Sequence, residues 1–168
     1  MSLSMARFNA LVDDHGAAMF RMAYRMVGDR HEAEDMVQET FRSAWKSREA
    51  YEPGRGDRAW LASILRRRIV DRWRRGNAQP ALSLIDANDR SVLGDDPLAD
   101  DYTDEMQRAL AHLPEELRET LLLVVVGELT HQEVADLLDL PLGTVLSRVS
   151  RARKRLRELL MAARPTTN

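Results

Sequence analysis

The segment 78–101 constrains the fold most, because it separates two stretches that both have helical periodicity. It is rich in proline, glycine and aspartate, and its apolar residues follow no regular period. A structureless connection of this length is uncommon inside one compact domain. We therefore predict two small helical domains, residues 1–77 and 103–168, joined by a flexible acidic linker over 78–102.

The flanking stretches repeat apolar residues at three- and four-residue spacings, which is typical of amphipathic helices. The run 121–126 is apolar throughout and could also be a buried strand. A core helix is favoured there because no flanking strand is predicted that could pair with it. The expected fold class is all-α, with helices at 6–27, 32–48, 57–75, 103–113 and 115–126 and two more that complete the chain.

Charge is distributed unevenly, although the formal net charge is only −2. Residues 58–75 contain seven arginines and one acid, and residues 148–157 contain six basic residues and no acid. Residues 86–105, by contrast, contain eight acids and one base. Local basic clusters, rather than net charge, supply affinity for phosphate, so the two basic blocks favour nucleic-acid binding.

The C-terminal stretch has the pattern of a helix-turn-helix. Thr130 and Glu133 have the spacing of a capping box, and the small Ala135 permits a close helix crossing. Asp139 can adopt the left-handed conformation that the turn requires. The last helix would bury one apolar stripe and expose a cationic face suited to the major groove. We expect this helix to start at Thr144. The candidate DNA-binding residues on its exposed face are Thr144, Ser147, Arg148, Arg151, Lys154 and Arg155. The alternative is a solvated basic face on an ordinary helical hairpin.

The basic helix at 57–75 carries aromatic and aliphatic residues among its arginines, namely Trp60, Ile64 and Trp73. We expect Asp57 to cap it. Arginine attracts phosphate, and aromatic or aliphatic side chains can stack on unpaired bases, so the combination suits single-stranded or melting DNA. The alternative places both tryptophans in the core and pairs Asp71 with an arginine one helical turn away.

Together these segments resemble one family, the sigma-70 sigma factors of bacteria. Residues 33–45 resemble the polymerase-binding helix of the family, and 58–75 resemble its −10 element helix. Residues 113–118 and 130–157 resemble its −35 element domain. The resemblance covers residues 8–160, and the absence of the additional domains of housekeeping sigma factors points to the extracytoplasmic-function (ECF) group.

The resemblance implies a transcription initiation factor with three partners: core RNA polymerase, promoter DNA and a restraining anti-sigma factor. It implies that the linker threads the nucleic-acid channel of the polymerase, and we expect the free protein to be a monomer. The implied polymerase-binding residues are Asp35, Gln38, Glu39, Phe41 and Trp45. The implied −10 residues are Trp60, Ser63, Ile64, Arg67, Asp71, Arg72, Arg74 and Arg75. Thr130 and Leu146 join the −35 residues named above.

Three positions differ from the usual residue of the family. Arg67 stands where asparagine is usual, Asp139 where glycine is usual, and Leu146 where lysine is frequent. These differences leave the expected fold unchanged and bear on which promoter sequence is recognised.

Other classes of protein fit the sequence less well. There is no cysteine, which excludes disulfides and thiolate metal sites, and the four histidines are scattered, so we expect neither an enzyme nor a metal or other cofactor. No apolar run is long enough for a membrane span, and no signal peptide is present, so we expect a cytoplasmic protein. A stand-alone helix-turn-helix regulator is the main alternative, but it leaves the two N-terminal motifs unexplained. A purely structural adaptor would not bind DNA in a salt-dependent way.

Overall fold

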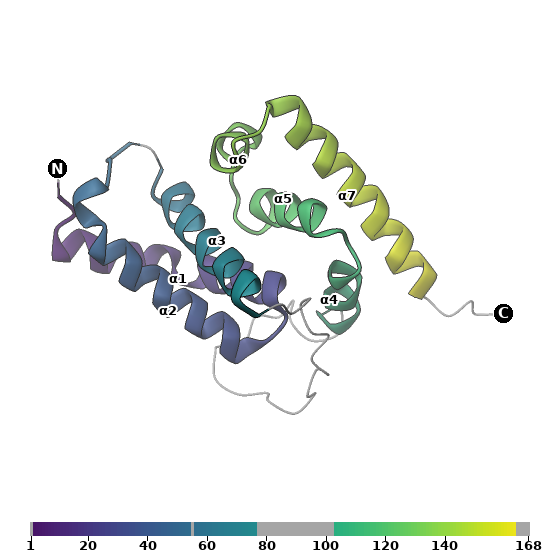
Figure 1. The fold of residues 1–168 in the computed structure, drawn as a ribbon, viewed down its shortest axis with the longest axis horizontal. Helices are drawn as coiled ribbons and strands as arrows, with labels where there is room; N and C mark the ends of the chain where they lie inside the picture. Colours follow the sequence, from purple (N-terminus) through teal and green to yellow (C-terminus); the bar gives the residue numbers. More distant parts are fainter. Residues whose placement is uncertain (1, 55, 77–102, 164–168) are drawn as a thin grey trace.

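A computed structural model describes residues 2–54, 56–76 and 103–163. All secondary-structure elements in these ranges are helices (Figure 1). The predicted linker 78–102 lies outside the described residues. In the described ranges the elements are α1 (Met5–Val27), α2 (Arg30–Lys46), the 3-10 turn η1 (Arg48–Ala50), α3 (Asp57–Gly76), α4 (Thr103–Ala111), α5 (Glu115–Val125), α6 (His131–Leu138) and α7 (Leu142–Ala163). The all-α prediction is confirmed, and the apolar run before Gly127 is a helix, as expected.

Local capping signals set the helix boundaries of the first half. The hydroxyl of Ser4 accepts a hydrogen bond from the Arg7 amide at 3.2 Å and starts α1. Gly28 ends α1 with φ of 77°, a conformation that glycine adopts without steric cost. Asp29 then accepts from the Glu32 amide at 2.8 Å and starts α2. Only a short connection therefore separates the two helices, and α1, α2 and α3 pack closely together.

The second half has the geometry of a helix-turn-helix. Thr130 and Glu133 form the predicted capping box at the start of α6, with both reciprocal hydrogen bonds present. Asp139 ends α6 in the left-handed conformation, with φ of 54°. Ala135 is buried below the crossing, and α6 and α5 both pack against α7. The capping box, the left-handed turn and the buried alanine at the helix crossing were all predicted from the sequence and are confirmed.

Two predicted helix starts differ from the structure. The last helix begins at Leu142 instead of Thr144, because the Pro141 carbonyl already accepts hydrogen bonds from the amides of Thr144 and Val145. Asp57 lies inside the first turn of α3 and does not cap it, because the Gly56 carbonyl accepts the first helical bond. The Asp57 carboxylate instead accepts from the hydroxyl of Tyr51.

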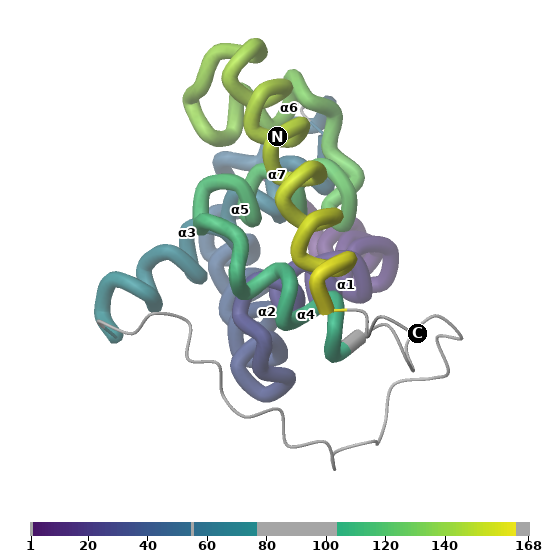
Figure 2. The backbone as a smooth tube through the Cα atoms, turned by 90° about the vertical axis from the view of Figure 1, so that its right-hand side faces the viewer, coloured from purple at the N-terminus to yellow at the C-terminus, as the bar shows by residue number. Residues whose placement is uncertain are grey.

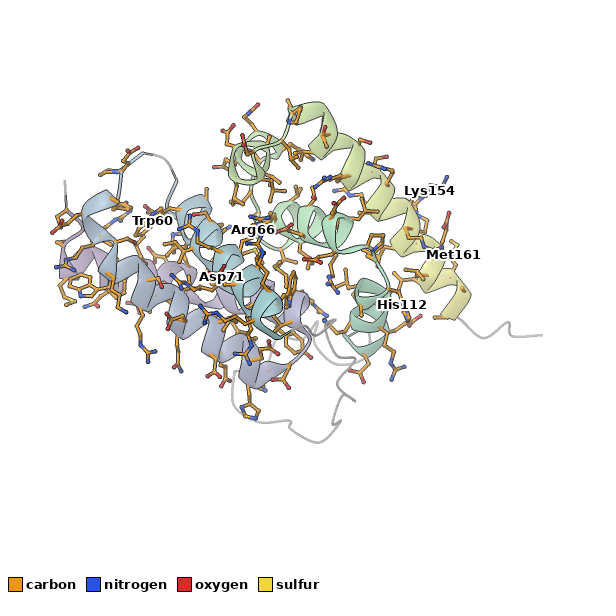
Figure 3. All side chains as sticks on the ribbon, in the orientation of Figure 1. Trp60, Arg66, Asp71, His112, Lys154 and Met161 are labelled. Atoms are coloured by element: carbon orange, nitrogen blue, oxygen red, sulfur yellow. The ribbon has the colours of Figure 1, made fainter. Side chains whose placement is uncertain are left out.

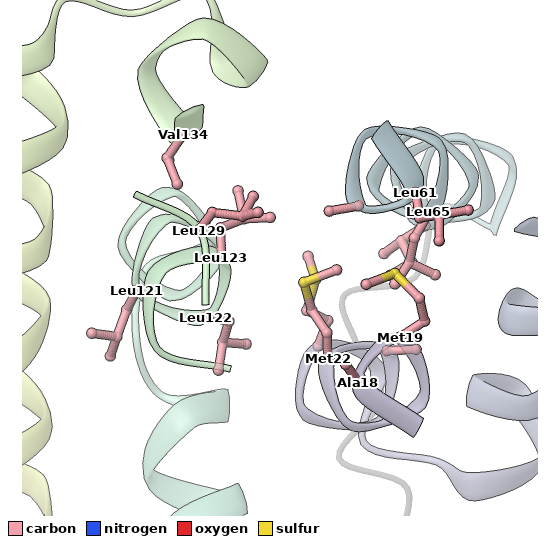
Figure 4. Close-up of a cluster of buried hydrophobic side chains, with 14 of the residues drawn as sticks. Ala18, Met19, Met22, Leu61, Leu65, Leu121, Leu122, Leu123, Leu129 and Val134 are labelled. Carbon is pink, nitrogen blue, oxygen red and sulfur yellow. The ribbon is translucent and has the colours of Figure 1, made fainter. Parts of the chain in front are cut away.

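The two predicted domains pack against each other and share one hydrophobic core. Figures 1 and 2 show the helices of both halves gathered in one body, in which α1 contacts α5 and α3 contacts α6. Met22 and Leu65 from the first half belong to the same buried cluster as Leu123 and Leu129 from the second half (Figure 4). The sulfur of Met22 lies so close to Gly127 that an added Cβ there would be 3.2 Å away. The described parts of the two halves therefore form a single packed body.

Candidate nucleic-acid interface

Helix α7 separates a buried face from a basic, exposed face. Val145, Val149 and Ala152 are buried, which confirms the predicted apolar stripe through the middle of the helix. On the other side Lys154 points away from the body of the molecule (Figure 3). Exposed polar or cationic residues at predicted −35 positions of α7 are Ser147, Arg151, Lys154 and Arg155, while Thr144 is half-buried. Arg151 is one helical turn from each of the other three exposed residues, so the four lie along one side of α7.

Arg148 is placed differently from the other predicted −35 residues. Only 18% of its side chain is exposed, and its guanidinium lies 3.5 Å from the carboxylate of Glu116 on α5. Its position on α7 turns it from the outer face toward α5, so its side chain connects these two helices.

Thr130 is exposed, but its side chain is engaged within the fold. Its hydroxyl accepts from the Glu133 amide at 3.1 Å, while its own amide donates to the Glu133 carboxylate at 2.7 Å. These bonds satisfy amides that the start of a helix leaves without partners. Thr130 therefore holds the start of α6, the helix that precedes α7.

Helix α3 presents arginines at the surface and keeps its aliphatic residues in the core. Among the predicted −10 residues Arg67, Arg72, Arg74 and Arg75 are exposed, and Asp71 is half-buried. Arg72 also lies 2.7 Å from the carboxylate of Glu32 on α2. Ile64 is only 7% exposed, because it shares the core-facing side of α3 with Leu61 and Leu65. The structure thus places Ile64 in the core, and not on a surface that a DNA strand could reach.

Trp60 and Ser63 lie near the start of α3 and are half-buried. The Trp60 ring contacts the Tyr51 ring edge-on, with centroids 5.1 Å apart, and the Ser63 hydroxyl donates to the Trp60 carbonyl at 2.6 Å. Tyr51 in turn donates to Asp57. The loop before α3 therefore holds the edge of Trp60 in place while leaving part of the side chain accessible.

Several groups of α3 are held by the second half of the chain. The guanidiniums of Arg58 and Arg66 pair with Glu128 and Glu119, respectively. The Trp73 ring lies against the guanidinium of Arg118, 5.7 Å from the ring centroid. In this arrangement part of the basic surface of α3 faces acidic side chains of the same chain.

Arg118 and Glu119 were missed by sequence reasoning, although a signal for them exists. Both are buried, at 4% and 7% exposure, within a helix that is otherwise largely apolar on its buried side. Burial lowers the pKa of the Arg118 guanidinium, while the charges of Glu115 and Glu119 oppose the shift. Charged residues are seldom buried without partners. Their presence beside an apolar run could have indicated a polar contact between the domains.

The predicted polymerase-binding residues share helix α2 and fall into two groups. Asp35 and Gln38 are exposed, and Glu39 is half-buried with its carboxylate 3.4 Å from Arg42. Phe41 and Trp45 are half-buried and contact the Phe8 ring of α1, with centroids 6.3 and 5.1 Å away, respectively. The acidic and amide groups are therefore available to a partner, while the aromatic pair also packs α2 against α1.

Two other kinds of site are absent from the described residues. In residues 2–54, 56–76 and 103–163 no group of three or more histidine and acidic side chains is arranged to hold a metal ion. Over the same ranges no helix combines the length and apolar character needed to cross a membrane.

Comparisons with known proteins match both halves of the chain. Residues 11–79 match the family model of sigma-70 region 2, and residues 103–156 match that of sigma-70 region 4. The ECF RNA polymerase sigma factor SigE of Mycolicibacterium smegmatis is 35% identical over 94% of this chain, which spans 63% of the length of that relative. The ECF sigma factor SigL of Mycobacterium tuberculosis is 32% identical, over 90% of this chain and 88% of its own length.

A solved structure has the same arrangement of both halves. The sigma factor RpoE of Bartonella quintana, crystallised with the anti-sigma factor NepR, is 28% identical with a TM-score of 0.76. The match covers 94% of this chain and 98% of that one. The chain belongs to the sigma-70 family of RNA polymerase sigma factors, in the ECF group. It is accordingly a transcription initiation factor.

Proposed function

We propose that this protein binds core RNA polymerase and directs it to promoters that carry matching −10 and −35 elements. The observation that carries the proposal is the presence, on one chain, of an accessible acidic face on α2 and two separate basic helices, α3 and α7. A stand-alone regulator would need only the helix-turn-helix, and would leave the surface around Asp35 without a role. The protein acts without enzymatic activity, in the cytoplasm, where the polymerase and its promoters are.

Each surface has a separate task in this proposal. The exposed carboxylate of Asp35 and the amide of Gln38 contact the polymerase. Arg67 and the exposed arginines at the end of α3 hold the phosphates of the separated −10 strand, and Trp60 contacts an unpaired base. The outer face of α7 enters the major groove at the −35 element, where Ser147 and Arg151 meet base edges or phosphates.

An anti-sigma factor is the expected regulator. The RpoE relative was crystallised with such a partner, and this chain shares its arrangement over nearly its whole length. We propose that an anti-sigma factor binds the free monomer and covers its polymerase- and DNA-binding surfaces. The sequence-based domains 1–77 and 103–168, joined by a linker over 78–102, are kept as part of the proposal.

Transcription of genomic DNA tests the proposal even though the promoter sequence is unknown. Core polymerase is incubated with fragmented genomic DNA from the source organism, with and without the protein, and the 5′ ends of transcripts are mapped. Starts that require the protein and share two sequence elements at −10 and −35 are the expected result. Core polymerase that initiates with a known sigma factor but gives no start that depends on this protein would overturn the proposal. Binding of the protein alone to a two-fold symmetric site would favour the stand-alone regulator instead.

A further inference from the structure

The first turns of α7 carry two large apolar side chains that are exposed to solvent. Leu142 and Leu146 are 40% and 48% exposed, and they lie four residues apart on one flank of the helix. The core contacts of α7 are made by Val145 and Val149, which are buried. The Leu146 side chain is therefore accessible to a binding partner.

The surroundings of Leu146 are open, and the charges nearest along the helix are positive. No heavy atom lies within 4 Å of the position that a Cβ on Gly143 would occupy, outside its own helix and chain neighbours. Ser147 and Ser150 beside Leu146 are exposed, and Arg151 and Arg153 follow on the next turn. A small apolar surface bordered by cations matches the major groove, where base edges lie between two rows of phosphates. It is less suited to an apolar protein partner, since interface cores are depleted of charge.

We infer that Leu146 contacts the C5-methyl group of a thymine in the −35 element and so selects a T·A pair at that position. The inference rests on the proposed function of α7 as the −35-binding helix. Major-groove base edges present hydrogen-bond donors and acceptors, and thymine alone among the four bases adds a methyl group. Leucine can form no hydrogen bond, so a polar edge placed against it would lose its water without gaining a partner. A methyl group is the one feature of a base edge that gains from this contact.

Removal of single methyl groups from the DNA tests the inference. A promoter found by the genomic experiment is prepared as a series of templates in which each −35 thymine, on either strand, is replaced singly by deoxyuridine. Deoxyuridine keeps the pairing edge and the O4 acceptor and lacks only the methyl. With wild-type protein and core polymerase, we expect one replacement to lower the initiation rate about fourfold, the amount that burial of one methyl group contributes. Replacement of the same T·A pair by C·G should lower initiation further, and 5-methylcytosine at that position should recover part of the loss.

Variants of the protein assign the effect to Leu146. Leu146→Ala should initiate equally well on the thymine and deoxyuridine templates, whereas Leu146→Met, which keeps an apolar side chain, should still distinguish them. Met161→Ala is the matched control, because Met161 is an exposed apolar residue of α7, 65% exposed, near the other end of the helix. This control should distinguish the templates as the wild type does.

The outcomes separate failure of the inference from failure of the proposed function. Wild-type initiation that no deoxyuridine replacement changes would overturn the inference and leave the proposed function standing. The inference would also be overturned if Leu146→Ala lowered initiation, relative to the wild type, by the same factor on the thymine and deoxyuridine templates. The variant would then still distinguish the two templates, which would indicate a protein contact instead. Absence of initiation on the unmodified promoter would remove the proposed function and, with it, the inference.

Discussion

The carboxylate of Glu119 on α5 forms an ion pair with the guanidinium of Arg66 on α3. The Glu119 side chain is 9% exposed, and that of Arg66 is 33% exposed. The pair therefore joins α3, the proposed −10 helix in the first half of the chain, to the second half at the edge of their shared core. A second pair, between Arg58 and Glu128, connects the same two parts of the chain.

Charge reversal at this pair should weaken the association of the two halves. Glu119→Arg places two guanidiniums together at a partly buried site, and we expect it to cost about 2 kcal/mol of domain association, because removal of one partner leaves a charge without compensation. The chain has no cysteine, so dyes can be attached at Glu49→Cys and Met161→Cys, two exposed positions in different halves. Energy transfer between the dyes should fall in Glu119→Arg and recover when Arg66→Glu is added. Unchanged transfer in the single variant would mean that the pair does not hold the domains together.

The capping box of α6 should contribute measurably to stability. In Thr130→Ala the side-chain bond to the Glu133 amide is lost, and we expect a loss of about 1 kcal/mol in the free energy of unfolding. Denaturant titration measures the change, and Thr130→Ser, which keeps the hydroxyl, should stay close to the wild type. Equal stability of all three proteins would contradict the structural role given to this threonine.

The predictions from sequence succeeded where the interacting residues are near each other along the chain. The capping box joins Thr130 and Glu133, and the left-handed turn at Asp139 depends on that residue and its neighbours. The apolar stripe of α7 follows from helical spacing in the same way. Such features do not depend on how helices pack, so both the helices and the basic face of α7 could be predicted.

Features that depend on packing could not be predicted. Arg66 and Glu119 are 53 residues apart, and no local pattern connects them. Ile64 lies among arginines in the sequence, but the rotation of α3 against the core buries it. Arg148 belongs to the basic block and yet turns toward Glu116. The sequence thus predicted the helices on which the candidate residues lie and could not predict which of those side chains are exposed.

Tyr51 should ionise at a higher pH than an ordinary tyrosine. Its hydrogen bond to Asp57, together with burial, raises the pKa of the phenol above the usual value of 10. Since the folded pKa is the higher one, the stabilisation is fully present below pH 10, the value expected for the unfolded chain, and is lost as pH rises through the folded pKa. Near-ultraviolet absorbance during an alkaline titration should show a late tyrosine step that is missing in Tyr51→Phe. A titration in which Tyr51→Phe removes an ordinary step near pH 10 would contradict the assignment.

Arg151 and Arg148 should respond differently to charge reversal, although both belong to the basic block. Arg151 is exposed, so Arg151→Glu should lower promoter-dependent initiation at least about tenfold while leaving unfolding unchanged. Arg148→Glu faces Glu116, and we expect it to lower the free energy of unfolding by about 1 kcal/mol. Run-off transcription and denaturant titration of both variants make the comparison. An equal loss of stability in the two variants would contradict the view that Arg148 contacts Glu116 while Arg151 is exposed to solvent.

Capture of core RNA polymerase by the purified protein tests the central claim most directly. The assay compares the wild type with Asp35→Arg, which reverses an exposed charge on α2, and with Asp13→Arg, which does the same on α1 outside the predicted polymerase-binding surface. We expect stable capture by the wild type and by Asp13→Arg, and loss of capture by Asp35→Arg. Folded wild-type protein, free of any inhibitor, that fails to capture the polymerase would contradict the account.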